Sequence, residues 1–240
     1  MSNFTSNLEK PSNMKKLILI GLFILSFFAS NAQEKRKFTF GLHLAPSIDW
    51  LKPNSLDYSS DGSIIGFTWG AFGEINFSEN YSIVTAIDFR STGGKLRYPD
   101  QYEANSIGFT NRTYHIKYIE VPLALKMSTN DIGKFSIWGK FGLGSAFVIG
   151  AKSDDEFTPI SGNVIKTENK DITSTISTFK ESLIIGLGTE YRISGSTKLV
   201  AGLIFNNGFT DILNGKNKKD SSVAEKAFVN QFELNIGIVF

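Results

Sequence analysis

Residues 232–240 read Phe232-Glu233-Leu234-Asn235-Ile236-Gly237-Ile238-Val239-Phe240, in which a large apolar residue occupies every second position. A period of two is typical of a β-strand, because successive side chains point to opposite faces of the strand. The face that begins at Phe232 is entirely apolar, whereas the opposite face, from Gln231 to Gly237, is polar or small. We therefore expect a strand that separates two different environments.

The same alternation recurs along the chain, and it predicts eight strands in all. The expected strands are residues 37–45, 64–77, 81–93, 113–127, 135–150, 179–193, 197–207 and 228–240. Long polar gaps lie at 46–63, 94–112, 151–178 and 208–227, and short turn-like gaps lie at 78–80, 128–134 and 194–196. This sorting of gaps is typical of membrane barrels. The predicted fold is all-β, an eight-stranded antiparallel up-and-down transmembrane β-barrel over residues 33–240, with long extracellular loops and short periplasmic turns.

The two faces of these segments differ in charge. The apolar rows assigned to the segments contain no Asp, Glu, Lys or Arg, which is expected because such a charge costs about 2–4 kcal/mol near the middle of a bilayer. The opposite rows carry Glu74, Asp88, Glu120, Glu190 and Glu233 together with Arg90, Lys126, Lys140, Arg192 and Lys198. Soluble sandwiches and barrels have the reverse arrangement, with their charges outside. The charged face is therefore predicted to line the lumen.

Aromatic residues gather near the ends of the expected strands, where a membrane barrel carries two interfacial girdles. One group is Phe38, Phe77, Tyr81, Phe135, Tyr191 and Phe240, and the other is Trp69, Phe89, Phe147, Phe205 and Phe232.

The first 32 residues are typical of a signal peptide for export. Lys15 and Lys16 precede an apolar stretch at 17–28, and Ser30-Asn31-Ala32 forms a small-x-small cleavage site. The alternative is a transmembrane anchor, but a spanning helix needs about 20 apolar residues. Met14 could be the true start. Cleavage after Ala32 would remove three lysines and one glutamate, which leaves a formally neutral mature chain.

The composition excludes several classes of function. The net charge is only +2 and forms no basic stripe, so nucleic acid is not an expected partner. The absence of cysteine excludes disulfides, thiolate metal sites and attachment through a lipidated cysteine.

Three short motifs in the expected strands and loops are Tyr118-Ile119-Glu120-Val121-Pro122-Leu123, Gly186-Leu187-Gly188-Thr189-Glu190-Tyr191 and Gly208-Phe209-Thr210-Asp211-Ile212. With these motifs the chain resembles the PorT-like outer-membrane β-barrel proteins of Gram-negative bacteria. The resemblance covers nearly all of residues 37–240 and implies the fold, an outer-membrane location and the assembly route. The founding relative is associated with protein secretion, but the family is functionally mixed, so this role is not transferred.

The last strand also resembles the signal that the barrel-assembly machinery reads, so this machinery is an expected partner during biogenesis. The residues of this signal are Phe232, Leu234, Ile236, Gly237, Ile238 and Phe240.

The charges of the lumen face have two interpretations, a relay for ions or a structural network. Eight strands enclose an interior that side chains about fill, and an unpaired buried charge is costly, so a structural network is favoured. Its predicted members are Glu74, Asp88, Arg90, Glu120, Lys140, Glu190, Arg192 and Glu233.

No catalytic, cofactor or metal site is predicted. His43 and His115 are the only histidines, and Ser145 has no histidine near it in the sequence, so a Ser/His hydrolase constellation is not indicated. The stretches 57–62 and 153–156 contain aspartates but lack the ligand spacing of a calcium loop, and they are interpreted as surface loops.

The functional hypothesis is a non-enzymatic barrel for surface or envelope interactions or for secretion, with a lumen filled by side chains. Its expected partners are outer-membrane lipid and an envelope or extracellular protein bound through loops 46–63, 94–112, 151–178 and 208–227. A small passive channel and an outer-leaflet lipid-modifying enzyme are the alternatives.

Overall fold

The computed structural model describes residues 37–102 and 106–240. The signal peptide expected at residues 1–32 lies outside the described residues. No helix in the described part of the chain is long and apolar enough to cross a membrane.

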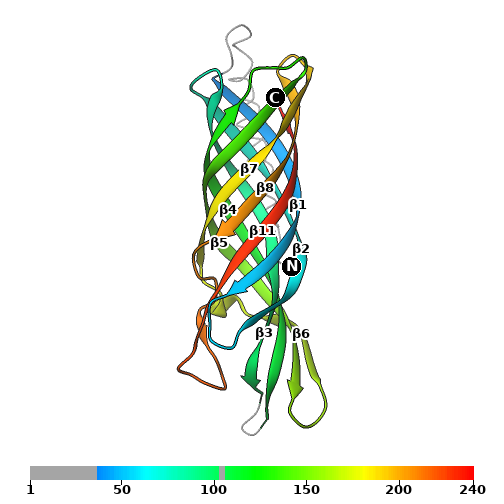
Figure 1. The fold of residues 1–240 in the computed structure, drawn as a ribbon, viewed down its shortest axis with the longest axis vertical. Helices are drawn as coiled ribbons and strands as arrows, with labels where there is room; N and C mark the ends of the chain where they lie inside the picture. Colours follow the sequence, from blue (N-terminus) through cyan, green and yellow to red (C-terminus); the bar gives the residue numbers. More distant parts are fainter. Residues whose placement is uncertain (1–36, 103–105) are drawn as a thin grey trace, which may run out of the picture. The chain divides into compact units, whose positions relative to one another are not determined.

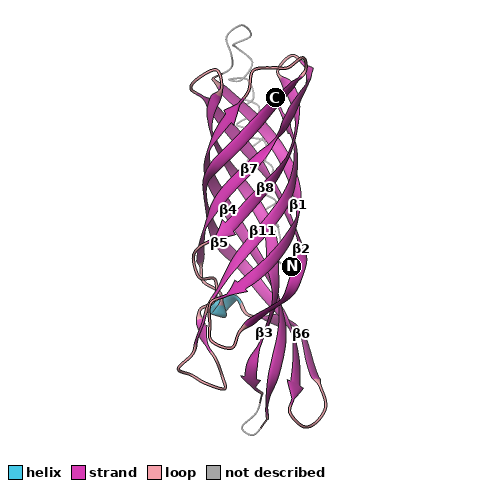
Figure 2. Cartoon of the chain, viewed as in Figure 1, coloured by secondary structure: helices cyan, strands magenta, loops and turns pink. Residues whose placement is uncertain are grey.

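Eight long antiparallel strands form the wall of the molecule (Figure 1). They are β1 (Phe38–Pro53), β2 (Ser59–Asn76), β3 (Tyr81–Gln101), β4 (Ile107–Ser128), β5 (Phe135–Pro159), β7 (Phe179–Ser194), β8 (Thr197–Gly208) and β11 (Ala227–Val239). The short elements are β6 (Ile165–Asp171), the 3₁₀ turn η1 (Thr173–Thr175), β9 (Gly215–Lys216) and β10 (Ala224–Glu225), and all lie at one end of the wall (Figure 2).

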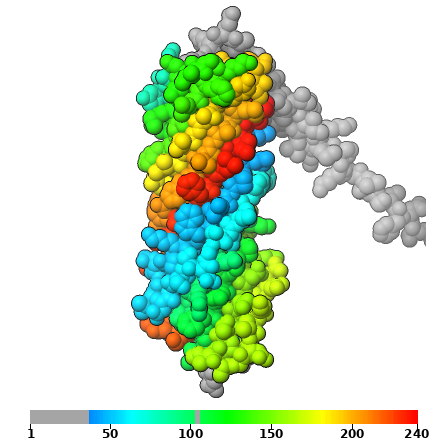
Figure 3. All heavy atoms as spheres, turned by 45° about the vertical axis from the view of Figure 1, so that its right-hand side comes forward, coloured from blue at the N-terminus to red at the C-terminus, as the bar shows by residue number. Residues whose placement is uncertain are grey.

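The eight strands close into a barrel. Each long strand pairs with the next long strand along the chain, and β1 pairs with β11 from Gly41 opposite Val239 to Pro53 opposite Ala227. The strands cross the wall obliquely (Figure 3), as closure of a barrel requires. The predicted eight-stranded antiparallel barrel is confirmed.

The wall is apolar outside and charged inside. The outward side chains include Leu42, Ile87 and Leu187, each more than half exposed, whereas Glu120, Arg90 and their neighbours on the inward face are buried. The two faces therefore have the polarity that the alternation predicts for a barrel surrounded by hydrocarbon.

Glu181 breaks this rule within the apolar band. Glu181 on β7 lies between the outward residues Phe179 and Leu183 and was not among the residues assigned to the apolar row. The hydroxyl of Ser145 on β5 donates a hydrogen bond of 2.9 Å to its carboxylate. The outward face therefore carries a charged group close to its aromatic edge.

The predicted long loops are wrong in extent, because pairing continues through most of them. β3 and β4 pair as far as Gln101 and Ile107, inside the expected loop 94–112, and β5 continues to Pro159. β6 then pairs with β5 inside the expected loop 151–178. The stretch 153–156, interpreted as a surface loop, is part of β5, and residues 59–62 of the other such stretch begin β2. Outside the bilayer both faces of a strand can be polar, so loss of alternation does not mark a strand end.

The outer parts of β3, β4 and β5 continue past the end of the barrel and form a sheet with β6 (Figure 1). We call this sheet the outer extension. We call this end of the barrel the loop end, and the end with connections 77–80, 129–134 and 195–196 the turn end.

Candidate functional site

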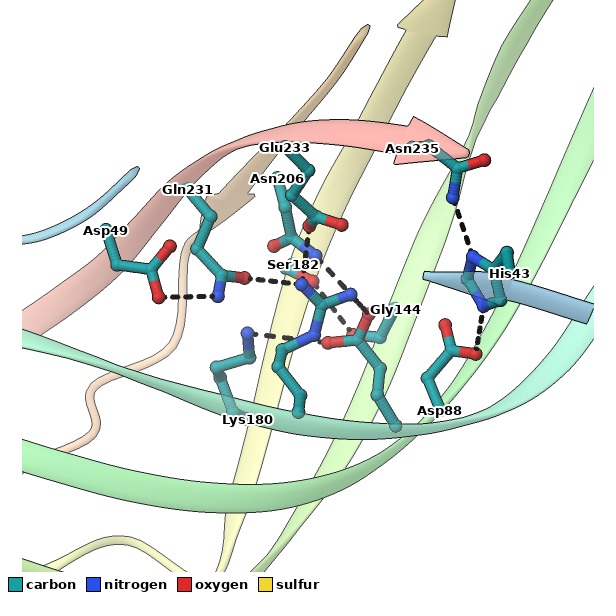
Figure 4. A network of polar contacts seen from close by, with 12 residues as sticks. His43, Asp49, Asp88, Gly144, Lys180, Ser182, Asn206, Gln231, Glu233 and Asn235 are labelled. Carbon is teal, nitrogen blue, oxygen red and sulfur yellow. Dashed lines mark hydrogen bonds and ion pairs between the residues drawn. The ribbon is translucent and has the colours of Figure 1, made fainter. Parts of the chain in front are cut away.

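The middle of the lumen contains an ion-pair network that joins strands from opposite sides of the wall. Arg90 on β3 donates from Nη2 to Glu120 Oε1 on β4 at 3.0 Å, and its Nη1 binds Glu233 on β11. The same Nη1 donates to Gln231 Oε1 at 3.0 Å. Lys180 on β7 completes the group, with its Nζ 3.5 Å from Glu120 Oε2. We call these five residues the central network, part of which is labelled in Figure 4.

Two further polar side chains extend this network. The amide of Asn206 donates to Glu120 Oε1 at 3.3 Å, and Gln231 donates to Asp49 Oδ2 at 3.4 Å. Asp49 is fully buried, and its carboxylate occupies the space that a side chain at position 66 would need, since a Cβ built on Gly66 would lie 2.0 Å from Asp49 Oδ2. Glycine at this position makes room for the carboxylate.

A second network lies nearer the turn end. Lys126 on β4 donates to Glu74 on β2 at 2.6 Å and also to Glu190 on β7. Lys198 on β8 binds the other oxygen of Glu190 at 2.7 Å. Both carboxylates and Lys126 are buried, so each charge has a partner of opposite sign in a place where an unpaired charge would be costly.

His43 lies on the inward face of β1. Its Nε2 is 2.8 Å from Asp88 Oδ1, and its Nδ1 is 2.6 Å from the Asn235 amide (Figure 4). Both ring nitrogens therefore have partners, one on β3 and one on β11, which fixes the orientation of the ring.

The predicted network residues do not all come together. Glu74, Asp88, Arg90, Glu120, Glu190 and Glu233 are buried in the lumen with the partners described above. Lys140 is also on the inward face, with its Nζ 5.8 Å from the centre of the Trp138 ring, but within the described residues it forms no ion pair closer than 4.0 Å. Arg192 lies past the end of the lumen, where it is exposed and binds Asp131 in the connection 129–134.

The sequence pattern does not predict four residues of the central network and its extension. Asp49 lies in the expected loop 46–63, Lys180 was not assigned to a face, and Asn206 and Gln231 are uncharged. Lys126 and Lys198 were assigned to the lumen face but not to the network. Lys180 and Glu190 are an even number of residues apart on one strand, so their side chains share a face. This spacing is the signal in the sequence that could have placed Lys180 in the lumen.

The loop end of the lumen is filled with apolar side chains. Inward residues of five strands meet Tyr58 from the β1–β2 connection and residues from the connections that follow β6 and β8. We call this cluster the apolar plug; it contains Leu51, Tyr58, Leu96, Tyr98, Tyr114, Ile116, Tyr118, Ala146, Ala151, Ile172, Ile176, Ile212, Leu213, Ala227 and Val229. Gly94 on β3 comes close to β1, since a Cβ there would lie 2.6 Å from the backbone nitrogen of Leu51.

Backbone hydrogen bonds hold the two plug connections against each other and against the wall. Ser177 N donates to Ile212 O at 2.9 Å, and Asn214 N donates to Thr175 O at 2.8 Å. Ile172 N donates to Ala151 O on β5 at 3.1 Å, and Ile212 N donates to Ala227 O on β11 at 2.9 Å. The expected loops 151–178 and 208–227 therefore contribute to the core as well as to the surface.

Tyr58 connects the plug to the tip of the β8–β11 connection. Its hydroxyl donates to Glu225 Oε1 at 2.9 Å and accepts from Asn217 Nδ2 at 2.8 Å. Burial raises the pKa of Tyr58 well above its ordinary value of 10.0.

Residues 28–235 match the family model described as outer membrane protein beta-barrel domain. The chain belongs to this family. As a member of the outer-membrane barrel family it is placed in the cell outer membrane.

Three solved structures of bacterial proteins resemble this family member in fold. Neisserial surface protein A is 14% identical over 85% of this chain and 96% of its own, with a TM-score of 0.43. OprG of Pseudomonas aeruginosa is 12% identical over 88% and 99%, with a TM-score of 0.49. Ail, the attachment invasion locus protein of Yersinia pestis, is 15% identical over 85% and 99%, with a TM-score of 0.40. No curated protein matches the chain at a significant level.

The aromatic residues of this family member form contacts along both edges of its apolar band. Toward the loop end Trp69 stacks on Phe89 with ring centres 4.5 Å apart, and Phe147 lies 5.2 Å from Phe179. Toward the turn end the ring of Phe135 lies 4.8 Å from that of Tyr191. Such pairs are typical of the interfacial girdles that mark the limits of the hydrocarbon.

The residues of the expected assembly signal lie on β11. Phe232, Leu234, Ile236, Ile238 and Phe240 have exposed or partly exposed side chains on the outer wall, and Gly237 faces inward opposite His43. The apolar row of this signal is thus on the lipid side.

The geometry around the histidines offers no hydrolase constellation. His43 binds Asp88 and Asn235, and His115 lies 3.3 Å from Asp154 in the outer extension. The hydroxyl of Ser145 binds Glu181 on the outer wall. The described residues also contain no group of three His, Cys, Asp or Glu side chains arranged to hold a metal ion.

Proposed function

We propose that this barrel is a non-conducting, non-enzymatic outer-membrane protein that presents the outer extension to a protein partner in the envelope or outside the cell. The observation that carries the proposal is the filling of the lumen. Two networks of paired charges and the apolar plug occupy it in succession, so most of the charged side chains that could line a pore bind one another.

The outer extension supports the second half of the proposal. Its strands are paired as far as Gln101, Ile107 and Pro159, which makes the surface rigid rather than a set of free loops. Arg112 and Asp155 lock β4 to β5 there through two hydrogen bonds of 2.6 and 2.7 Å. A preorganised surface loses little conformational entropy when it binds a partner.

Exposed apolar side chains lie at the tip of the outer extension. They are Tyr102, Ile107, Phe109, Ile160 and Val164, and Ile160 is 80% exposed. Apolar groups that extend into water beyond the bilayer are typical of contact surfaces.

Within the family we place the chain among the PorT-like barrels, on the strength of the motifs at 118–123, 186–191 and 208–212. We expect the chain to be exported by its signal peptide, which is cleaved after Ala32. The barrel-assembly machinery then inserts the mature chain into the outer membrane.

A site-specific photo-crosslinker tests the proposed partner. A crosslinker at Ile160 is expected to give one reproducible protein adduct in cells that naturally produce the barrel, whereas the matched control at Leu187, which is 65% exposed on the lipid face, gives only lipid adducts. Absence of a protein adduct at Ile160, Val164 and Phe109 alike would contradict the proposal.

Planar-bilayer recording tests the filled lumen. The full chain is expected to give no steady ion current at physiological salt. A stable open state would instead promote the passive-channel alternative, and a change in lipid A mass that requires His115 would promote the enzyme alternative.

A further inference from the structure

The outward face of β4 and β5 carries a basic cluster immediately beyond the loop-side edge of the apolar band. Lys117 and His115 on β4 and Lys152 on β5 are all exposed. Lys117 lies opposite Gly150 and His115 lies opposite Lys152, so the two lysines are diagonal neighbours across one strand pair. Ser91 on β3, also exposed, lies opposite Lys117 on its other side.

A β-bulge brings the two lysines to the same face. The pairing of β4 with β5 shifts between Lys117 and Tyr118, because Tyr118 lies opposite Val148 but Lys117 lies opposite Gly150. Before the bulge the odd-numbered residues of β5 face outward, as Phe147 and Ile149 do, and after it Ala151 is buried and Lys152 is exposed. Without the extra residue Lys152 would face the lumen, so the bulge re-aims this side chain.

The charges of this cluster are incompletely neutralised by the protein. Within 37–102 and 106–240, neither Lys117 nor Lys152 has an ion-pair partner within 4.0 Å. The carboxylate opposite Lys152 is Asp171, which is exposed, and Asp154 is directed to His115 at 3.3 Å. The lysines of β6 differ, since Lys166 binds Glu156 at 2.9 Å and Lys170 lies 3.6 Å from Asp155.

The surface directly below the cluster is apolar. Ile119, Phe147 and Ile149 lie on the outward face of the same two strands, and Phe147 belongs to the aromatic edge of the band. A lipid beside this wall would have its acyl chains against these side chains and its head group at the level of the lysines. Lysine stems can lie along such a surface while the ammonium groups reach the head groups.

We propose that Lys117 and Lys152, with the hydroxyl of Ser91, form a binding site for a phosphate of lipid A in the outer leaflet. The loop end of such a barrel faces the cell exterior. In the outer membrane this is the leaflet whose phosphates belong to lipid A. Two neighbouring ammonium groups match a phosphate as point charges, and each basic residue at a membrane surface favours an anionic lipid.

Binding of fluorescent diphosphoryl lipid A to the full chain in detergent tests this site. Lys117→Gln and Lys152→Gln should each weaken binding about 5-fold, and the double variant about 30-fold. The control variant Lys166→Gln/Lys170→Gln removes the same charge from β6 and should change binding less than about 2-fold. Lys117→Arg/Lys152→Arg should retain binding, and heat-modifiability on gels reports folding of every variant.

Two results would overturn the proposal. One is equal affinity of the unmodified chain and the folded Lys117→Gln/Lys152→Gln variant for diphosphoryl lipid A. The other is lysine-dependent binding of phosphatidylglycerol that equals that of lipid A, which would assign the site to glycerophospholipids. Dephosphorylated lipid A should bind the unmodified chain as weakly as diphosphoryl lipid A binds the double variant.

Discussion

The central network and the apolar plug fill neighbouring parts of one lumen by opposite chemistry. The central network is ionic, and every member belongs to a wall strand that is hydrogen-bonded on both sides. The plug is apolar, and part of it comes from connections that fold in from the loop end. The difference indicates that the central network depends on strand register alone, whereas the plug also depends on connections that lie outside the eight wall strands.

The largest expected effect comes from removing the shared carboxylate of the central network. Glu120→Ala leaves Arg90 and Lys180 buried without their common partner, and we expect a loss of about 3–5 kcal/mol in the free energy of unfolding. Urea unfolding in lipid vesicles measures this loss. The control Glu156→Ala breaks an exposed pair with Lys166 and should cost less than about 1 kcal/mol. Equal losses in the two variants would mean that depth in the lumen does not matter.

A smaller effect is expected in the plug. Ile212→Ala truncates a fully buried side chain, which costs roughly 2–5 kcal/mol in a rigid core, and a value near 2 kcal/mol is expected because the connection can collapse into the space. Protease cleavage within 209–226 should become faster while the barrel stays folded. The exposed residue Ile160 supplies the control, Ile160→Ala, whose cleavage rate should equal that of the unmodified chain. Unfolding of the whole barrel by Ile212→Ala would refute the independence of the two regions.

Alkaline pH should loosen the plug connections through Tyr58. Because burial raises the pKa of Tyr58 in the folded protein, the unfolded connection loses its phenolic proton first as the pH rises through 10.0. The folded form then binds more protons, so stability falls with rising pH, by about 1 kcal/mol between pH of about 10 and 11. Protease cleavage within 209–226 should accelerate over this range, and it should do so less in Tyr58→Phe. An identical pH profile in both proteins would exclude Tyr58 as the cause.

The smallest effect is expected for Glu181, whose carboxylate lies on the outward face of the barrel. Glu181→Leu replaces an outward charge near the aromatic edge by an apolar residue, and we expect a gain of about 0.5–1 kcal/mol in unfolding free energy. Leu183→Glu, at the next outward position on β7, should destabilise instead. A loss of stability in Glu181→Leu would show that the hydrogen bond from Ser145 outweighs the cost of a charge beside lipid.

Alternation predicted the number of strands and their two faces because hydrocarbon outside and paired charges inside impose opposite chemistry on successive residues. It failed where that contrast disappears. β5 continues through Asp154, Asp155 and Glu156, which lie outside the bilayer and were interpreted as loop. Alternation also does not show where along a strand the lumen ends. Arg192 is on the same face of β7 as Glu190 but lies past the end of the lumen.

Features that depend on distant contacts could not be predicted. Ile172 and Ile176 are isolated apolar residues and Ile212-Leu213 is a short apolar pair, all in polar stretches, and only the folded connections place them in one cluster. The extra residue at Ile149 is invisible in the sequence, although it reverses which residues of β5 face outward. The partners of Arg90 were likewise undetermined, because strand alternation gives the face of a side chain but not its neighbours across the lumen.

The pairing of β1 with β11 has a consequence for how the molecule is made. Gly41 lies opposite Val239, so the seam joins the first long strand of the barrel to its last. Contacts between such distant residues carry an entropic cost and form slowly. The barrel therefore cannot close before β11 has been synthesised, and an open chain outside the membrane exposes its lipid-facing residues to water unless a chaperone covers them.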